Sequence, residues 1–157
     1  MTVRFRNVDV EPGTPVRDWP AEAIETAIDR GMLSDWRLLA NEIRRDPWGG
    51  VARTVETVIG WKEHYGVDAL MALVIVKARE DVTRQGRAAY AEQIRAWRRD
   101  AGMTLRQFAR AAGTSASRLS DYENAKVAPT TDVLGRLRHV ASQHEGSREK
   151  IKSEIVL

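Results

Sequence analysis

The chain has 157 residues, no cysteine and a net charge of +3, with 43% hydrophobic and 30% charged residues. This length and balance predict a globular protein of one domain or two small ones rather than a disordered chain. The absence of cysteine excludes disulfides and thiolate metal sites, so nothing opposes a cytoplasmic location.

The first segment, from Thr2 to Val10, alternates apolar and polar side chains, which predicts a short strand or an extended arm. One strand cannot form a sheet alone. The segment must therefore lie on the helical core, pair with a second subunit or remain loose. Gly13 and the prolines around it keep the chain out of helix until Ala21.

Four helices are predicted in the rest of the first half, because apolar residues recur there at helical spacing. They cover Pro20–Arg30, a segment capped by Ser34 with Asp35 in its first turn, Val51 to about Glu63, and Val67–Arg79. The last is almost wholly apolar, so we expect it at the centre of a domain or at an interface. Its apolar run is too short to span a bilayer.

Tryptophan is concentrated in this half of the chain, at Trp19, Trp36, Trp48 and Trp61. Three interpretations are open: core packing of short helices, a surface that faces a partner, and a pocket for an aromatic ligand. We favour core packing, because short helices need bulky side chains to bury enough area.

A polar stretch from Glu80 to Arg87, which contains Gly86, predicts a boundary between two domains. The first domain then covers residues 1–82 and the second residues 83–145. A helix is expected to follow from Arg87 to Ala101 and to end at Gly102. Its buried residues are Tyr90, Ile94 and Trp97.

Two short helices joined by a tight turn are predicted between Thr104 and Asn124. Thr104 and Gln107 have the capping-box spacing at the start of the first helix. Gly113 ends that helix in a left-handed conformation, and Ser115 starts the next one. Small residues at Ala109, Ala112 and Ala116 let the two helices cross closely, as a helix-turn-helix requires.

The segment from about Tyr90 to Gln143 resembles the XRE family, the phage repressor and Cro type of helix-turn-helix. The resemblance is carried, in order, by Arg98, Gly102, Thr104, Ala109, Gly113, Ser115, Ser117, Leu119, Ser120, Tyr122, Glu123, Lys126, Pro129 and Leu134. Two positions depart from the family pattern. Leu105 stands where the family often has Gln, and Ala125 replaces the usual Gly, at the cost of strain if its φ must be positive.

The resemblance implies a set of DNA contacts, because such proteins place the first turns of the second helix against base edges. The implied base contacts are Ala116, Ser117, Ser120 and Asp121. The implied phosphate contacts are Arg106, Ser115, Arg118 and Lys126. Asp121 either accepts a hydrogen bond from cytosine or points to Arg118. The family pattern also implies a structural ion pair between Arg98 and Glu123.

Beyond the second helix, Lys126 and Pro129 mark a loop, and Thr130 caps a helix. Its apolar residues, which close the core, are Val133, Leu134, Leu137, Val140 and Ala141. Residues 146–157 begin polar and end in Ile155, Val156 and Leu157. They form either a frayed tail or an apolar end that docks on a partner chain.

Charge is divided unevenly between the two halves. Residues 1–82 hold 11 Lys and Arg against 14 Asp and Glu, whereas residues 83–157 hold 14 against 8. The basic half is the one with the helix-turn-helix, where phosphates would be neutralised. The predicted fold is therefore all-α: an N-terminal bundle of short helices followed by a five-helix, repressor-type helix-turn-helix domain.

These features predict a sequence-specific DNA-binding repressor that binds a double-stranded operator as a homodimer. The resemblance favours the autoregulating antitoxin of a toxin–antitoxin operon, which would hold a cognate toxin through its first half. The alternative is a protein-interaction module that neutralises or tethers a partner without reading DNA, as Leu105, Ala125 and Asp121 indicate.

Other functional classes find no support in the sequence. No phosphate-cradling glycine loop and no nucleophile beside a base is present, so we expect neither an enzyme nor a cofactor. The histidines, His64, His139 and His144, are scattered, and we expect no metal site. No basic-then-apolar leader opens the chain, and we expect no membrane association.

Overall fold

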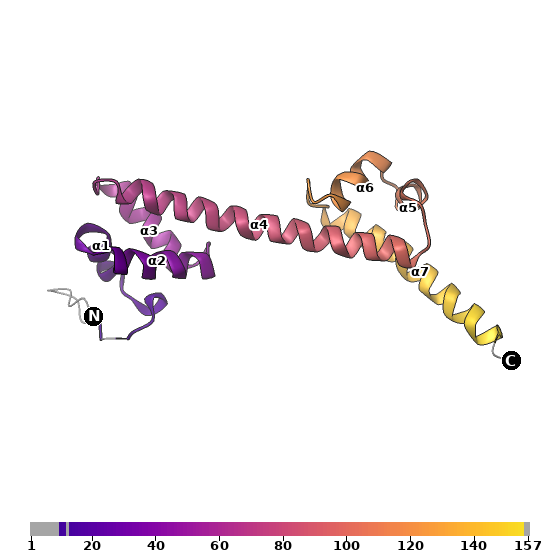
Figure 1. The fold of residues 1–157 in the computed structure, drawn as a ribbon, viewed down its shortest axis with the longest axis horizontal. Coiled ribbons are helices and arrows are strands. Elements are labelled where there is room, and N and C mark those ends of the chain that lie inside the picture. The colour runs from indigo at the N-terminus through magenta and orange to yellow at the C-terminus, as the bar shows by residue number, and fades with distance from the viewer. Residues whose placement is uncertain (1–9, 12, 156–157) are drawn as a thin grey trace. The chain divides into compact units, whose positions relative to one another are not determined.

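The computed structural model describes residues 10–11 and 13–155, without the side chains of residues 146–150. Within these residues the chain forms only helices (Figure 1), which confirms the predicted all-α class. They are η1 (Val16–Asp18, a 3-10 helix), α1 (Ala21–Arg30), α2 (Leu33–Arg45), α3 (Gly50–Trp61), α4 (Val67–Asp100), α5 (Leu105–Ala111), α6 (Ala116–Glu123) and α7 (Thr131–Ile155). The predicted strand or arm over Thr2–Val10 lies outside the described residues except for Val10.

Contacts between residues divide the chain into a first unit, Met1–Val82, and a second unit, Thr83–Leu157. In the first unit, η1, α1, α2 and α3 pack against one another. The first turns of α4 complete their core. Its largest buried side chains are four residues apart in α1 and in α2, which places them on one face of each helix, and α3 and α4 add one each. They are Ile24, Ile28, Leu39, Ile43, Val55 and Met71.

A polar contact links α3 to α4 inside the first unit. The Arg79 guanidinium donates to both carboxylate oxygens of Glu56, at 2.7 and 3.0 Å, and to the Pro47 carbonyl at 2.9 Å. The Trp48 ring lies 5.7 Å from the same guanidinium carbon, within range of a cation–π interaction. Hydrogen bonding to Arg79 holds the pKa of Glu56 below its ordinary value.

The tryptophans divide between core and surface. Trp19 and Trp36 are partly buried against the first-unit core, and their indole N–H groups donate to the carbonyls of Thr14 and Ala27 at 3.0 and 2.9 Å. Trp48 and Trp61 are exposed, at 51% and 73%. Core packing therefore accounts for two of the four, and the interpretation is wrong for Trp48 and Trp61.

The start of α2 differs from the prediction that Ser34 caps it. The helix begins two residues earlier than a cap at Ser34 would give, at Leu33, with Met32 as its N-cap residue. The Asp35 carboxylate accepts a hydrogen bond from the Met32 amide at 2.8 Å. A carboxylate in the first turn accepts a hydrogen bond from a free amide and interacts favourably with the positive end of the helix dipole. The Asp35 carboxylate therefore caps the helix in place of the Ser34 hydroxyl.

A single helix, α4, replaces the two helices predicted over Val67–Arg79 and Arg87–Ala101. The segment Glu80–Arg87, which was expected to separate these two helices, is itself helical because its residues, apart from Gly86, are compatible with a helix. One interior glycine costs only about 1 kcal/mol relative to alanine. Nearly all residues from 82 to 90 are exposed, and a helix that is polar all round is typical of a solvated connection.

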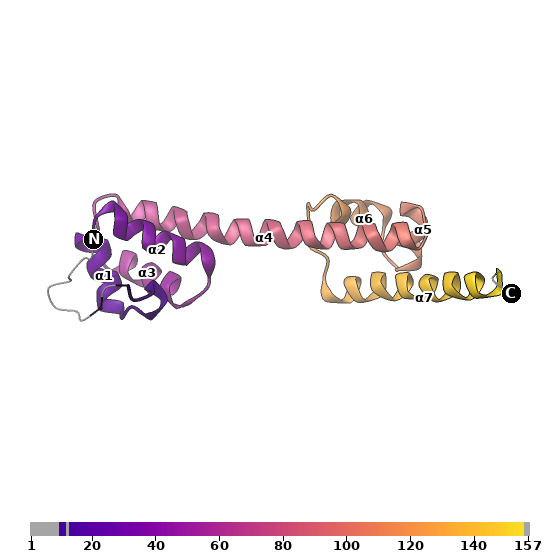
Figure 2. The ribbon, with the colours of Figure 1, turned by 60° about the horizontal axis from the view of Figure 1, so that its bottom comes forward.

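The second unit is built from the C-terminal part of α4 together with α5, α6 and α7 (Figure 2). It has these four helices among the described residues rather than the five predicted. Its buried core consists of Ile94, Phe108, Ala109, Ala112, Leu119, Tyr122, Val133, Leu137 and Val140. These residues come from all four helices, so each helix contributes one apolar stripe to a common core.

The last helix, α7, continues to Ile155, so the frayed tail expected after Glu145 is wrong for the described residues. Its first turns belong to the second-unit core through Leu137 and Val140. That anchored segment supplies the helix nucleus, and extending a helix from an existing turn is far easier than starting one. Residues 156–157 lie outside the described part, and docking of this end on a partner stays a prediction.

Candidate nucleic-acid interface

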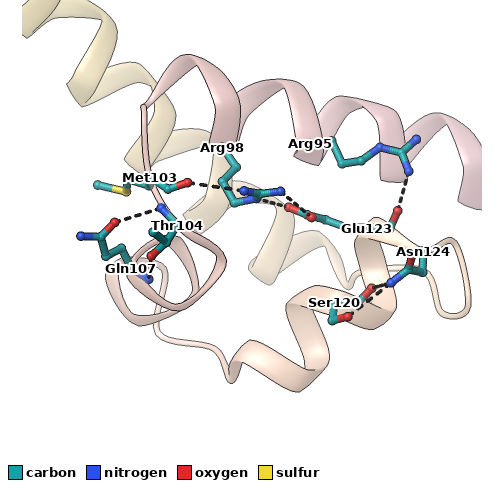
Figure 3. A network of polar contacts seen from close by, with 8 residues as sticks. All are labelled: Arg95, Arg98, Met103, Thr104, Gln107, Ser120, Glu123 and Asn124. Carbon is teal, nitrogen blue, oxygen red and sulfur yellow. Dashed lines mark hydrogen bonds and ion pairs between the residues drawn. The ribbon is translucent and has the colours of Figure 1, made fainter.

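The first helix of the helix-turn-helix, α5, starts with the predicted capping box (Figure 3). The Thr104 hydroxyl accepts from the Gln107 amide at 3.3 Å, and the Gln107 side chain accepts from the Thr104 amide at 2.9 Å. These reciprocal bonds satisfy two amides that have no partner inside the helix. Phe108 and Ala109 on its inner face are buried, which fixes α5 on the core.

A glycine turn joins α5 to α6. Gly113 has φ +64°, and the amides of Gly113 and Thr114 donate to the carbonyls of Arg110 and Ala109. This pair of bonds is a Schellman motif, which ends a helix at a left-handed residue. The Ser115 hydroxyl then accepts from the Arg118 amide at 3.1 Å and caps α6, as the sequence predicts.

The second helix, α6, ends in the same way, but with alanine at the left-handed position. Ala125 has φ +57°, and the amides of Ala125 and Lys126 donate to the carbonyls of Tyr122 and Asp121. An L-amino acid in this conformation is strained by its Cβ, by about 1–2 kcal/mol. The departure from the family's glycine therefore has the cost that the sequence suggests.

Two arginines of α4 hold the C-terminal end of α6 (Figure 3). Arg98 donates from Nε and Nη2 to the two carboxylate oxygens of Glu123, at 2.7 and 3.0 Å. Arg95 donates to the Glu123 backbone carbonyl at 2.8 Å and also pairs with Glu92. The Glu123 carboxylate is the most buried of these charged groups, and its hydrogen bond raises the pKa of Arg98 above the ordinary value.

The residues implied as base contacts are all on α6, but Ala116 packs against the second-unit core, which leaves Ser117, Ser120 and Asp121 outside it. Leu119, Tyr122 and Glu123 are the buried residues of this helix. Ser117 is exposed, whereas Ala116, Ser120 and Asp121 are half-buried. The Ser120 hydroxyl accepts from the Asn124 side chain at 3.3 Å, so it already has a partner within the helix.

The residues implied as phosphate contacts are all exposed: Arg106, Ser115, Arg118 and Lys126. The structure pairs one of them with an implied base contact, because Lys126 Nζ lies 3.5 Å from the Asp121 carboxylate. The sequence suggested Arg118 as the neighbour of Asp121, and the ion pair is with Lys126 instead. The Schellman turn at Ala125 brings Lys126 back over the last turn of α6.

Two structural arginines were missed by the sequence analysis, Arg95 and Arg136. Arg95 precedes Arg98 by three residues on α4, so the shared helix face was a signal that it also reaches α6. Arg136 of α7 donates to the carbonyls of Ala112 and Gly113. No local sequence pattern marks this contact, because its partners lie more than 20 residues away.

Comparison with known protein families agrees with this geometry. Residues 89–141 match a family model described as a helix-turn-helix domain, which belongs to the XRE-like group. No curated protein and no solved structure matches the chain significantly. The resemblance to the XRE family is confirmed for this segment, and domains of this kind are typical of DNA-binding regulators.

Two other kinds of site, a metal centre and a membrane-spanning helix, are absent from the described residues. No group of three or more His, Asp or Glu side chains is arranged to hold a metal ion there. Within the same part of the chain, no helix has both the length and the apolar character needed to cross a membrane. The buried His64 is instead paired with Asp68, whose carboxylate lies 2.7 Å from Nδ1 at the start of α4.

Proposed function

We propose that this chain is a sequence-specific DNA-binding transcription regulator, with residues 83–145 as the reader and α6 as its recognition helix. The observation that carries the proposal is the division of α6 into two faces. Leu119, Tyr122 and Glu123 hold it on the core, while Ser117 and Arg118 near its N-terminal end are exposed. This is the arrangement in which a helix can enter the major groove.

Charge supports the same assignment. The second unit carries 14 Lys and Arg against 8 Asp and Glu, whereas the first carries 11 against 14. Most non-specific DNA affinity comes from the neutralisation of phosphates by positive side chains. The excess of positive charge lies in the second unit, which contains the helix-turn-helix. The exposed arginines Arg106 and Arg118 flank the base-reading positions and are suited to phosphate contacts.

The proposed biological role is repression by a homodimer. One recognition helix reads only a few base pairs, so useful specificity needs two half-sites about one helical turn apart. Residues 1–82 would provide dimerisation or partner binding, and autoregulation as the antitoxin of a toxin–antitoxin operon is the specific role we propose. The exposed Trp48 and Trp61 give this half side chains that a partner protein would bury.

A second candidate function rests on the Asp121–Lys126 ion pair. It places a carboxylate at a base-reading position and draws a phosphate-binding lysine to that carboxylate. In this alternative the helix-turn-helix binds a protein partner and reads no DNA. Selecting bound sequences from a random double-stranded DNA library separates the two: the regulator enriches a two-fold symmetric motif, and the interaction module enriches none.

A further inference from the structure

The turn between α5 and α6 is held from outside by a side chain of α7. Arg136 Nη1 donates to the Ala112 carbonyl and to the Gly113 carbonyl, both at 2.9 Å. Its Nη2 lies 3.1 Å from the carboxylate of Asp132, one helical turn earlier in α7. The aspartate therefore orients the guanidinium toward the two carbonyls.

Neither of these carbonyls accepts a hydrogen bond of the Schellman motif. The motif uses the carbonyls of Ala109 and Arg110, and Arg136 serves two later carbonyls. The C-terminal end of a helix carries partial negative charge, and a charged donor makes a stronger hydrogen bond than a neutral one. Arg136 thus completes the C-terminal cap of α5.

The contact is close enough to depend on the glycine. A Cβ placed on Gly113 would lie 2.8 Å from Arg136 Nη1. A larger residue at this position would therefore require the guanidinium to shift, and the positive φ would strain it as well. Gly113 and Ser115 are exposed and Thr114 is half-buried, so hydrophobic burial does little to hold this turn.

We propose that Arg136 is a positioning residue for DNA recognition: it fixes the α5–α6 turn, and with it the direction in which α6 presents Ser117 and Arg118, without itself contacting DNA. This inference rests on the proposed function, in which α6 reads DNA. Base contacts require alignment to within about 0.5 Å, so small changes of the turn weaken them. Non-specific contacts depend on charge and tolerate such changes.

A positioning residue and a phosphate contact have different signatures. Removing an arginine that contacts a phosphate weakens binding to every DNA sequence alike. It also reduces by about one the salt slope, which is the steepness with which the logarithm of the affinity falls with the logarithm of the salt concentration. Removing Arg136 is expected to reduce the ratio of specific to non-specific affinity by about tenfold, the equivalent of one good base contact. The salt slope of the Arg136 variant should differ from that of wild type by no more than the slope of a variant that loses one positive charge elsewhere on α7 does.

The experiment compares the full-length wild type with Arg136→Ala, Arg136→Lys and Arg138→Ala. Arg138 is exposed on the same helix and controls for the loss of one positive charge. Affinities for the selected DNA site and for a scrambled duplex are measured over a salt series. Hydrogen exchange of the Thr114 amide, which bonds to the Ala109 carbonyl at 2.9 Å, reports on the turn without DNA.

The expected result is a loss of specificity ratio and faster Thr114 exchange in Arg136→Ala only, with partial rescue of both by Arg136→Lys. Equal weakening on both duplexes with a salt slope lower by about one would assign Arg136 to a phosphate and overturn the inference. Unchanged Thr114 exchange in Arg136→Ala would overturn it as well. If the wild type binds no DNA, the proposed function fails, while Thr114 exchange still decides whether Arg136 fixes the turn.

Discussion

The Glu123 carboxylate in α6 receives two hydrogen bonds from the Arg98 guanidinium in α4, at 2.7 and 3.0 Å. The two partners are not equally buried, because the glutamate side chain is 10% exposed and the arginine side chain 29%. An unpaired charge costs most where water cannot reach it. Removing Arg98 and removing the charge of Glu123 should therefore change the free energy of unfolding by different amounts.

Arg98→Met should destabilise the second unit by about 3 kcal/mol, because it leaves the buried Glu123 carboxylate without its partner. Glu123→Gln should cost less, since the amide oxygen still accepts from Arg98 and the guanidinium is partly hydrated. Urea unfolding of both variants measures the difference in the free energy of unfolding. The exposed pair Arg95–Glu92 provides the control, and Glu92→Gln should leave the free energy of unfolding nearly unchanged. Equal costs for Arg98→Met and Glu92→Gln would contradict the account.

Ala125→Gly should stabilise the second unit by about 1 kcal/mol, because glycine adopts the left-handed conformation without a Cβ clash. The φ of +57° at Ala125 is the motivation. The midpoint of urea unfolding should rise. Ala128→Gly, an exposed change in the same loop, should give no gain, because glycine there adds only freedom to the unfolded chain. A lower midpoint for Ala125→Gly would show that the strain is relieved in another way.

Asp121→Asn should increase affinity for all DNA sequences, because it removes a negative charge from the interface and releases Lys126 from its 3.5 Å ion pair. The released lysine should add about one to the salt slope. Binding to the selected site and to a scrambled duplex over a salt series measures both effects. Glu145→Gln, a loss of an exposed acid on α7, is the control. Loss of preference for one base pair, with no general gain, would instead assign Asp121 to cytosine.

The Glu56–Arg79 pair predicts a pH dependence in the first unit. Hydrogen bonding to Arg79 lowers the pKa of Glu56 from its ordinary 4.5, so the pair stabilises the folded state above that pH. The stability is lost as the pH falls through the lowered value. Glu56 is 43% exposed, so the effect should be at most about 1 kcal/mol. Glu56→Gln should therefore be less stable than wild type at pH 7, and the difference should disappear as the pH falls through the lowered pKa of Glu56. Glu63→Gln, which changes an exposed acid outside the Glu56–Arg79 contact, is the control at pH 7 and should differ little from wild type.

Local patterns predicted the helix-turn-helix well. The capping box at Thr104, the left-handed Gly113 and the cap at Ser115 each depend on residues within five positions of one another. Apolar spacing likewise identified much of the second-unit core, including Ile94, Leu137 and Val140. In these places local chemistry and tertiary packing favour the same structure. The spacing was wrong for Tyr90, which was expected to be buried and is 42% exposed.

Features decided by distant contacts were missed. The polar segment around Gly86 was interpreted as a boundary that ends one helix and precedes another, but a single helix continues through it, and each of its flanking parts is anchored on a core. Trp48 is on the surface beside Arg79, a partner more than 30 positions away. Arg136 is the clearest case, since its role depends on carbonyls of a turn that only the folded chain brings near.

The most direct test of the central claim, that α6 reads DNA, is binding of Ser117→Ala and Arg118→Ala proteins to the selected site and to its single-base variants. Ser117→Ala should change the preference at one position of each half-site by about 1–3 kcal/mol. Arg118→Ala should weaken binding to every sequence alike and lower the salt slope by about one. If neither substitution alters the binding of DNA, α6 does not read it, and the protein-interaction function takes its place.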